Sequence, residues 1–458
     1  MPINSFLYPG ASGPVPYEVD NSLMFDDSGI DSLTRTQSAG NRRTFTLSFW
    51  VKRSGLGSDE AIFNINNGTN PYARIYFNDN GSFHIDDYNG DQDTDLRTTR
   101  VFRDVSAWYH IVIAYDTTQS TASNRIKLYV NGSQETSFST ETYPAQNFDT
   151  EYNNNSQVLE IGDYNNDDSF NGYLSEVVMI DGTALAPTSF GEFDSDSPNI
   201  WKPIDVSTLT FGTNGFYLDF ENSSSLGNDA AGSNNFTVNN LTAINQSTDT
   251  CTNNFCVLNP LEPHANKNTF SEGNIVVSGG SGAWHLARGT FGLTQGKWYW
   301  EVFFSGGTVG NYHAGVQVAS ATTYSSLHSQ AGTTTFYNGD GGEIFTGSSG
   351  AFTTNDYGTM NGSSDILGVA LNMDDKQITF YKNGSAIVTN YSLDTPNDTM
   401  MPLSVQYGSS QVTKINFGGT QHTAISSGNS DANGYGNFEY SVPSGYYSIN
   451  SKNLAEFG

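Results

Sequence analysis

The sequence predicts an all-β protein made of two antiparallel β-sandwiches in tandem, and three observations support this fold class. Short runs of alternating apolar and polar residues, bounded by Gly, Asn, Asp and Ser, repeat along the chain. No segment shows three turns of helical periodicity with capping signals at its ends. At 458 residues, the chain is too long for one hydrophobic core and suits two domains of roughly 150–200 residues each.

The composition agrees with this prediction. Aromatic residues make up 13% of the chain although hydrophobic residues reach only 36%, and only 14% of residues are charged. β-Sandwiches have this balance because aromatic side chains fill a thin core, while exposed strand positions and long loops are polar. A disordered chain of this polarity would be poor in aromatics, so the protein is expected to fold.

The charge excludes two classes of partner. The net charge is −28, from 47 acidic and 19 basic residues. A nucleic-acid binder needs a basic face, and the basic pair Arg42-Arg43 is too small to form one. Anionic membranes do not attract so acidic a chain. No apolar stretch approaches the ~18 residues of a spanning helix, and the first ten residues lack the features of a secretory signal. We expect synthesis in a cytoplasm and no membrane insertion.

The first predicted domain spans residues 17–200. Alternate apolar residues from Phe45 to Val51 would face one side of a strand. The pair Asn131-Gly132 follows another apolar run and signals a hairpin, because both turn positions need positive φ. The strands expected in this domain are 22–25, 43–52, 60–66, 74–78, 82–86, 108–116, 125–130, 157–161 and 174–180.

Three further segments are predicted to follow the first domain. Residues 201–266 keep too many aromatics for a free linker and are predicted to form an ordered connecting strap. The second domain spans 267–419, and the tail, 420–458, is aromatic enough that we expect it to pack on another surface. The strands expected in the second domain are 274–278, 297–304, 313–318, 334–337, 365–372, 377–382, 403–407 and 414–417.

Residues 1–16 are predicted to form an N-terminal arm. Phe6, Leu7, Tyr8 and Pro9 are apolar, and the residues from there to Pro16 resemble a flexible tether. An apolar extended arm outside a domain often adds a strand to a neighbouring subunit or fills a groove on it. Two alternatives stay open, because the arm either anchors the protein on a particle or packs on its own domain.

Four motifs of the first domain, in one fixed order, resemble a known family. They are TFTLSFWVK at 44–52, WYHIVIAY at 108–115, RIKLYVNG at 125–132 and GYLSEVVMID at 172–181. This order resembles that of the laminin-G-like, or concanavalin A-like, jelly-roll family. The resemblance covers residues 17–200 and implies a concanavalin A-like sandwich.

The second domain carries motifs of a related kind. They are GKWYWEV at 296–302, HAGVQV at 313–318, DILGVALNMD at 365–374, QITFYKNG at 377–384 and MPLSVQY at 401–407. They resemble the SPRY domain, which is also a concanavalin-like sandwich, and in that family they are core strands. Trp298 and Trp300 are accordingly expected in the core. The two resemblances together imply two tandem concanavalin A-like antiparallel β-sandwiches (jelly rolls).

Joined in this order with the arm and the aromatic tail, the whole chain resembles a class of bacteriophage virion surface proteins. These are fibre, tail or capsid-decoration components. The resemblance implies a non-enzymatic structural protein on the virion surface, with other virion proteins as partners and with a host-surface glycan or protein as a further partner. It favours a homo-oligomer, preferably a trimer. The alternatives are a carbohydrate-binding adhesin or receptor-binding protein and, behind it, a glycoside hydrolase.

Concanavalin-like sandwiches include laminarinase-type glycoside hydrolases, whose strand motif resembles E-x-D-x-x-E. Such enzymes need two carboxylates close together across a cleft. Glu160 and Asp163 here are three apart with no third carboxylate, and Glu176 and Asp181 would lie on opposite faces of a strand. No G-x-S-x-G elbow occurs, and His110 is expected to be an ordinary strand residue. We predict no catalytic residues.

Calcium is the one cofactor that the sequence brings into question. The acidic strings 163–168 and 86–95 offer the oxygen ligands that hard cations prefer. Neither has the glycine position and terminal glutamate of a helix–loop–helix calcium site, so we interpret both as solvated loops and keep calcium as the alternative. Cys251 and Cys256 cannot make a disulfide framework, and reduced thiols are expected rather than a local bridge.

The ligand-binding candidates lie in the second domain. Exposed aromatics in Gly-rich loops are the usual surfaces for sugar stacking and protein contact. Tyr312, Tyr324 and Tyr337 lie at expected loop ends, with Asp340 close behind Tyr337. Because SPRY domains bind partners through their loops, the resemblance makes these four residues the candidates. The alternative for each tyrosine is ordinary loop packing.

Overall fold

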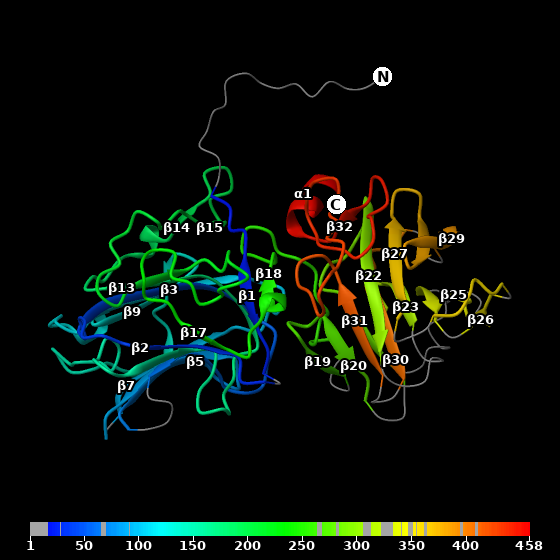
Figure 1. Cartoon of the computed structure of the whole chain (residues 1–458). Coiled ribbons are helices and arrows are strands. Elements are labelled where there is room, and N and C mark those ends of the chain that lie inside the picture. The colour runs from blue at the N-terminus through cyan, green and yellow to red at the C-terminus, as the bar shows by residue number, and fades with distance from the viewer. Residues whose placement is uncertain are drawn as a thin grey trace, which may run out of the picture.

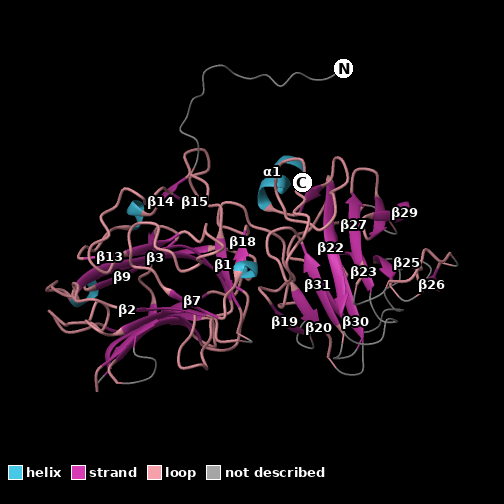
Figure 2. Ribbon diagram, in the orientation of Figure 1, coloured by secondary structure: helices cyan, strands magenta, loops and turns pink. Residues whose placement is uncertain are grey.

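The computed structural model describes two β-sandwiches that lie side by side (Figure 1). Strands make up nearly all of the regular structure drawn (Figure 2), so the predicted fold class, all-β with two tandem antiparallel sandwiches, is confirmed. The described residues are 17–27, 29–65, 70–90, 92–262, 268–280, 284–305, 313–321, 333–339, 341–346, 351–353, 355–360, 364–393, 397–407 and 411–458.

Sheet A of the first sandwich has eight strands, all paired antiparallel. The long strand β13 borders β1 with its first half and β16 with its second, and a bulge at Glu176 separates the halves. In spatial order the strands are β10 (Ser133–Gln134), β9 (Ile126–Val130), β8 (Tyr109–Asp116), β3 (Thr44–Arg53), β13 (Gly172–Asp181), β1 (Ser22–Phe25) and β18 (Gln246–Ser247), with β16 (Phe216–Leu218) beside β13.

Sheet B packs against sheet A and also has eight antiparallel strands. Its curved strands lie beneath those of sheet A in Figure 1. In spatial order they are β11 (Phe138–Thr142), β7 (Gln92–Val101), β6 (Ser82–Tyr88), β5 (Tyr72–Phe77), β4 (Glu60–Ile65), β12 (Val158–Ile161), β2 (Ser32–Thr36) and β17 (Thr237–Asn239).

The core of the first sandwich follows from the alternation along its strands. The predicted inward residues from Phe45 to Val51 are fully buried, and they meet inward residues of sheet B such as Phe63 and Ile75. Each such side chain stabilises the fold by about 1.5–3 kcal/mol on burial. The hairpin predicted at Asn131-Gly132 joins β9 to β10, and both residues have positive φ, 47° and 76°.

The strap belongs structurally to the first sandwich. Its strand β16 pairs with β13, β17 extends sheet B beside β2, and β18 extends sheet A beside β1. The sequence indicates β16 as a strand within residues 215–220, whereas β17 and β18 are three and two residues long, too short for an alternation pattern to reveal them. The strap therefore closes the sandwich at the edge that faces the second domain.

The chain from residue 185 to residue 217 covers the outer face of sheet A. The outward side chains Val112, Val178 and Ile180 are buried against it in a small second core. A hairpin of β14 (Gly191–Phe193) and β15 (Trp201–Pro203) lies on this side.

His110 lies under that hairpin, on the outer face of sheet A. Its ring stacks between Trp50 and Trp201, at 4.8 and 6.0 Å between ring centroids. Trp201 donates its indole N–H to Nδ1 of His110 at 2.9 Å. Burial lowers the pKa of His110 to about 3. His110 is therefore the packed strand residue that the sequence analysis expected, and it stays neutral.

The second sandwich is built from sheets C and D. Sheet C runs β19 (Thr269–Ser271), β20 (Val276–Ser278), β31 (Val412–Asn416), β22 (Lys297–Ser305), β27 (Ile366–Asn372), β28 (Gln377–Lys382) and β29 (Ser385–Ser392), and β32 (Tyr447–Ser448) pairs in parallel with β22. Sheet D runs β21 (Trp284–Arg288), β30 (Met400–Tyr407), β23 (His313–Val318), β24 (Thr334–Asn338), β25 (Ile344–Thr346) and β26 (Ala351–Phe352). Trp298 and Trp300 are fully buried between the sheets, which confirms the prediction for both.

The tail packs on the outer face of sheet C, as its aromatic content predicted. Phe438 is fully buried against Tyr299, with 5.2 Å between ring centroids. Glu301 accepts the backbone N–H groups of Glu439 and Tyr440 at 2.9 and 2.8 Å. The chain then forms α1 (Ser451–Phe457), and in the described part of the chain 3-10 turns lie at Ala122–Asn124, Pro187–Ser189 and Ala243–Asn245. Within the described residues, no helix is long and apolar enough to cross a membrane.

A buried ion pair marks the seam between the two sandwiches. Lys52, on the outer face of sheet A, lies 2.7 Å from Asp249 of the strap, and both side chains are fully buried. Lys52 also donates to Asn254 at 2.8 Å, and Asp249 accepts the indole N–H of Trp108 at 3.1 Å. A buried pair is stable only when its remaining hydrogen-bonding capacity is also met. Asn254 and Trp108 provide these additional hydrogen bonds for Lys52 and Asp249, so the strap is held firmly on sheet A.

Direct contacts continue this seam into the second sandwich. The Tyr173 hydroxyl donates to the Gly273 carbonyl at 2.8 Å and accepts from the Thr420 hydroxyl at 3.2 Å. The Asn274 side chain donates to the Ser54 carbonyl at 3.1 Å. These bonds join β13 and the end of β3 to both ends of the second domain, so the two sandwiches are docked on each other. Cys251 and Cys256 are free thiols, as expected.

Candidate functional site

Most residues singled out from the sequence lie outside the described part of the chain. These are the ligand-binding candidates Tyr312, Tyr324 and Asp340 and the anchoring candidates Phe6, Leu7, Tyr8 and Pro9. Nothing in the structure bears on their roles, which stay predictions.

Tyr337 lies in the core rather than at a loop end. It belongs to β24, where its neighbours across the sheet are Ala314 and Ile344, whose side chains also face the interior. The ring is 0% exposed, and its hydroxyl donates to the Gly358 carbonyl. Burial raises the pKa of this hydroxyl well above its usual range. The strand continues to Asn338, beyond the point where the sequence analysis ended it, and Tyr337 therefore presents no surface for a ligand.

The acidic strings considered for calcium serve as structural contacts. Asp163 is fully buried and accepts the Ser169 hydroxyl at 2.6 Å and the Asn166 backbone N–H at 2.9 Å. Asp86 forms an ion pair with Arg74 at 3.0 Å. Among the described residues, no group of three or more His, Cys, Asp or Glu side chains is arranged to hold a metal ion.

The outer face of sheet B carries a row of polar residues that the sequence analysis did not identify. The register places one residue of each strand opposite the next, straight across all eight strands. Each row residue adjoins a residue that packs in the core, so the row faces outward, although Asn64, Asp86 and Glu160 are themselves buried. We call this the polar row, and in spatial order it consists of Thr142, Asp95, Asp86, Arg74, Asn64, Glu160, Thr34 and Thr237.

Aromatic rings flank the polar row on both sides. On one side, Tyr72 and Tyr88 stack with 5.4 Å between ring centroids and 19° between planes. On the other side, Tyr76 and His84 lie 4.6 Å apart. Tyr164 approaches from the loop between β12 and β13, 6.2 Å from Tyr72. Tyr72, Tyr88 and Tyr164 are half-buried and therefore keep part of each ring at the surface.

Arg74 is the centre of this face. Its guanidinium lies 4.3 Å from the ring centre of Tyr76 and 4.7 Å from that of Tyr164. It pairs with Asp86 at 3.0 Å and with Asp168 at 3.3 Å. Cation–π contacts of this kind contribute about 0.5–2 kcal/mol each. The tyrosines around the row are therefore held in fixed positions before any ligand arrives.

The protonation states on this face follow from burial and from neighbouring charges. Burial raises the pKa of Asp86, although the Arg74 guanidinium beside it opposes the shift. Burial lowers the pKa of His84, which keeps the imidazole neutral at neutral pH, and its Nε2 lies 2.8 Å from Asp95. Burial also raises the pKa of Glu160. The face thus carries more carboxyl groups than cations. At its centre, the positive charge of Arg74 is compensated by the neighbouring carboxyl group of Asp86.

Glu176 is a buried acid on the opposite sheet that the sequence analysis placed only by its distance from Asp181. It sits at the bulge of β13 with φ of 51°, between β1 and β16. The hydroxyls of Tyr17 and Tyr217 donate to its carboxylate at 3.0 and 2.8 Å. Burial raises its pKa to about 7. Its surroundings are enclosed by the protein's own side chains, so we assign it to packing and not to a catalytic pair.

Comparison with family models identifies both domains. Residues 27–188 match Laminin_G_3, described as the concanavalin A-like lectin/glucanases superfamily, and residues 297–420 match the SPRY domain. The chain therefore carries a concanavalin A-like domain followed by a SPRY domain, in agreement with the two resemblances seen in the sequence. The two domain types together suggest a binding or interaction module.

Solved structures similar to this chain include a SPRY domain and a pentraxin. The SPRY domain of human HERC1 is 18% identical over 36% of this chain and 99% of that chain, with a TM-score of 0.30. A heptameric SAP-like pentraxin from Limulus polyphemus is 15% identical over 37% of this chain and 80% of that chain, with a TM-score of 0.29. The comparison with curated proteins gave no match.

Proposed function

We propose that this protein is a non-enzymatic binding component of a bacteriophage particle surface, and that it binds neutral glycans of the host surface through the outer face of sheet B. The observation that carries the proposal is the polar row flanked by tyrosine rings on a concanavalin A-like sandwich. The proposed place on a phage particle rests on the resemblance of the chain's architecture to phage fibre, tail and capsid-decoration proteins.

The chemistry of the row suits a sugar chain. A pyranose ring presents C–H groups on its faces and hydroxyls around its edge, so it needs an aromatic surface next to hydrogen-bonding side chains. Tyr72, Tyr88 and Tyr164 offer partly exposed rings, and Asp95 and Asp168 offer partly exposed acceptors. A sugar ring would bind where Tyr72, Tyr88 and Tyr164 keep part of their rings at the surface, because Asn64, Asp86 and Glu160 of the row are themselves buried.

The charges on this face favour neutral glycans over acidic ones. Arg74 would be the natural partner of a sugar carboxylate, but it already pairs with Asp86 and Asp168. Asp95 adds another acidic group on the same row. An acidic sugar would meet net negative charge here and in the whole chain, whose net charge is −28.

A glycan array tests the proposed recognition. We expect selective binding to neutral glycans and none to sialylated or uronic-acid glycans, with unchanged binding when a chelator removes calcium. Absence of selective binding would refute the proposed recognition. Calcium-dependent binding would instead support the cation alternative for the acidic loops.

Glycoside hydrolysis is the second candidate function, and one observation favours it. Asp86 and Asp95 face each other across neighbouring strands, which is the kind of carboxylate pairing that glycosidases use. Against it, Asp86 is committed to Arg74 and Asp95 lies against His84. Incubation with the polysaccharide that binds best decides the question, because only a hydrolase releases reducing sugar from it.

The placement on the particle has its own test. We propose that residues 1–16 anchor the protein and that a homotrimer is the assembled form. Deleting residues 1–16 should abolish incorporation into particles while the remaining protein still folds. Undiminished incorporation would refute the anchoring role, and a mass in solution other than three times 49.7 kDa would refute the trimer.

A further inference from the structure

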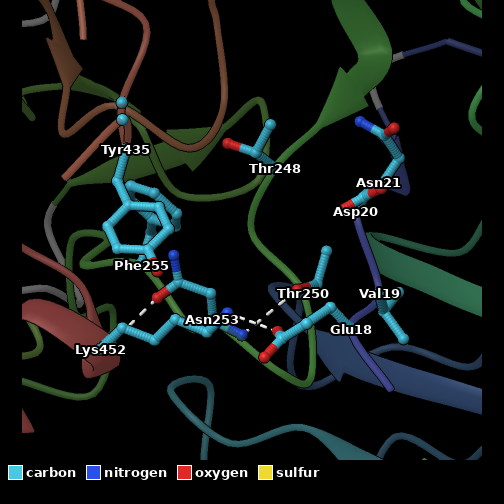
Figure 3. A pocket seen from close by; sticks show the side chains of 12 residues that line it. Glu18, Val19, Asp20, Asn21, Thr248, Thr250, Asn253, Phe255, Tyr435 and Lys452 are labelled. Carbon is cyan, nitrogen blue, oxygen red and sulfur yellow. Dashed lines mark hydrogen bonds and ion pairs between the residues drawn. The ribbon is translucent and has the colours of Figure 1, made fainter. Parts of the chain in front are cut away.

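A pocket of about 360 Å³ opens at the seam where the first sandwich, the strap and the tail meet (Figure 3). Small-molecule pockets typically have volumes of about 300–1,000 Å³, so this one suits a single small ring. Its walls come from three stretches of chain far apart in sequence, within residues 18–21, 248–255 and 434–452. We call it the seam pocket.

Asn253 supplies a fixed donor in the seam pocket. The residue is only 6% exposed. Its backbone N–H donates to the Thr250 hydroxyl at 3.2 Å, and its side-chain oxygen accepts the backbone N–H of Lys452 at 3.3 Å. The amide nitrogen on the other side points into the pocket (Figure 3), and within the described residues no hydrogen bond from it is found. It is thus oriented in advance to donate to an acceptor oxygen of a ligand.

An aromatic wall and two exposed polar residues complete the pocket. The rings of Tyr435 and Phe255 lie together on one side (Figure 3). Thr248 and Asp20 are exposed at the rim and offer a hydroxyl and a carboxylate. An aromatic surface next to a fixed donor and several acceptors is the arrangement that recognises the face and hydroxyl edge of a sugar ring.

The charges in the pocket disfavour an ionic ligand. Lys452 forms an ion pair with Glu18, and its ammonium lies 5.5 Å from the centre of the Tyr435 ring. With these two charges paired, Asp20 is the remaining charged group on the wall. An anion would be repelled by Asp20, while hydroxyl groups can donate to it.

We propose that the seam pocket is a second binding site of this protein, one that takes a single ring of a neutral sugar. It shares no residue with the polar row and does not rest on the function proposed for that row. The two sites would let one molecule hold two glycan segments at the same time, which raises avidity without any new contact.

Saturation-transfer NMR on the full-length protein tests this site, with free D-glucose, D-galactose, D-mannose and N-acetyl-D-glucosamine as probes. We expect at least one of them to bind. Asn253→Asp keeps the acceptor for Lys452 but replaces the donor with an oxygen, and it should weaken binding at least ~10-fold. In a Tyr72→Ala background, which weakens binding at the face of sheet B, Thr248→Tyr fills the exposed rim and should abolish the remaining binding, whereas Thr208→Tyr, at an exposed position outside the pocket, should leave it unchanged.

The controls separate this site from the face of sheet B. Tyr72→Ala should leave monosaccharide binding at the seam pocket intact. Should Asn253→Asp fail to fold, which thermal melting would reveal, Thr248→Tyr decides alone, because its side chain is exposed. The proposal is overturned when no probe binds at millimolar concentration, and equally when binding persists in the Tyr72→Ala/Thr248→Tyr double variant or disappears in Tyr72→Ala alone.

Discussion

The two outer faces of the first sandwich follow the same alternation along their strands, but that of sheet A carries apolar residues and that of sheet B carries polar ones. Sheet A turns Val112, Val178 and Ile180 outward, and the chain from residue 185 to residue 217 buries them. Sheet B turns a row of charged and amide side chains outward, with Arg74 at its centre. The outward residues therefore indicate what each face contacts. Apolar outward side chains, as on sheet A, have to be covered by another part of the chain, whereas polar outward side chains, as on sheet B, do not.

The two faces therefore have different roles within one domain. The face of sheet A holds the chain together, since it packs the strap and, through Lys52, fixes the seam to the second sandwich. The face of sheet B keeps partly exposed tyrosines around its polar row. Mutations on the first face should consequently change stability, and mutations on the second should change binding.

The largest effect is expected at the buried ion pair of sheet A. Lys52→Met removes the cation and leaves Asp249 buried without it, which should lower the free energy of unfolding by about 3–5 kcal/mol. Urea denaturation followed by tryptophan fluorescence measures the change. The matched control is Arg43→Met, whose pair with Asp149 is exposed, at 43% and 47%, and which should leave the free energy of unfolding close to that of the wild type. Equal losses in the two variants would contradict the account of the seam.

The next effect is a pH dependence that also belongs to sheet A. The pKa of Glu176 is raised by burial from 4.5 to about 7, so the folded protein binds this proton more tightly than the unfolded chain does. The stabilisation is fully present below about pH 4.5 and is lost as the pH rises through about 7. Between pH 5 and pH 8, we expect the free energy of unfolding to fall by on the order of 1–3 kcal/mol from this group.

Glu176→Gln should flatten part of that pH dependence. A remainder will persist, because burial also raises the pKa of Glu301 to about 7 and that of Asp31 to about 6. Thermal melting at several pH values checks the slope, with Glu141→Gln, at an exposed position, as the control. A slope in Glu176→Gln as steep as in the wild type would show that this proton is not bound on folding.

A smaller effect on stability is expected on the face of sheet B. Arg74→Lys keeps the charge but loses the planar group that pairs with Asp86 and Asp168 and lies against Tyr76 and Tyr164. The free energy of unfolding should fall by about 1 kcal/mol, within the range of a charge-assisted hydrogen bond. The affinity for a neutral glycan should fall about 10-fold, since the tyrosines lose their common support. Isothermal titration calorimetry measures the loss of affinity, and urea denaturation of the same sample measures the loss of stability. An unchanged affinity would contradict the role of Arg74 in supporting the tyrosines.

The fold was largely predictable because its strongest signals are local. The alternation from Phe45 to Val51, the hairpin at Asn131-Gly132 and the tryptophans of β22 all lie within single strands or turns. The strap was harder, since its strands β17 and β18 are three and two residues long and gain their structure from pairing with β2 and β1. That the strap belongs to the first sandwich depends on these tertiary contacts, which a local sequence pattern does not show.

The candidate site could not be read from the sequence. The polar row takes one residue from each of eight strands, from Thr34 to Thr237, and only the register of those strands aligns them. A partial signal was present in the segments at 72–77 and 82–88, where tyrosines and charged residues alternate with apolar ones. Tyr337 illustrates the opposite error, because its side chain faces the interior of the sandwich from β24 and lies in the core.

The measurement that tests the central claim most directly compares one tyrosine from each outer face. Tyr72 borders the polar row of sheet B, and Tyr129 is half-buried on the outer face of sheet A. The dissociation constant for the best neutral glycan is measured for Tyr72→Ala and Tyr129→Ala, both in a Thr248→Tyr background that blocks the seam pocket. The account predicts at least ~10-fold weaker binding for Tyr72→Ala, about 1.4 kcal/mol, and less than about 2-fold for Tyr129→Ala. Equal affinities, or a loss confined to Tyr129→Ala, would contradict the assignment of glycan binding to sheet B.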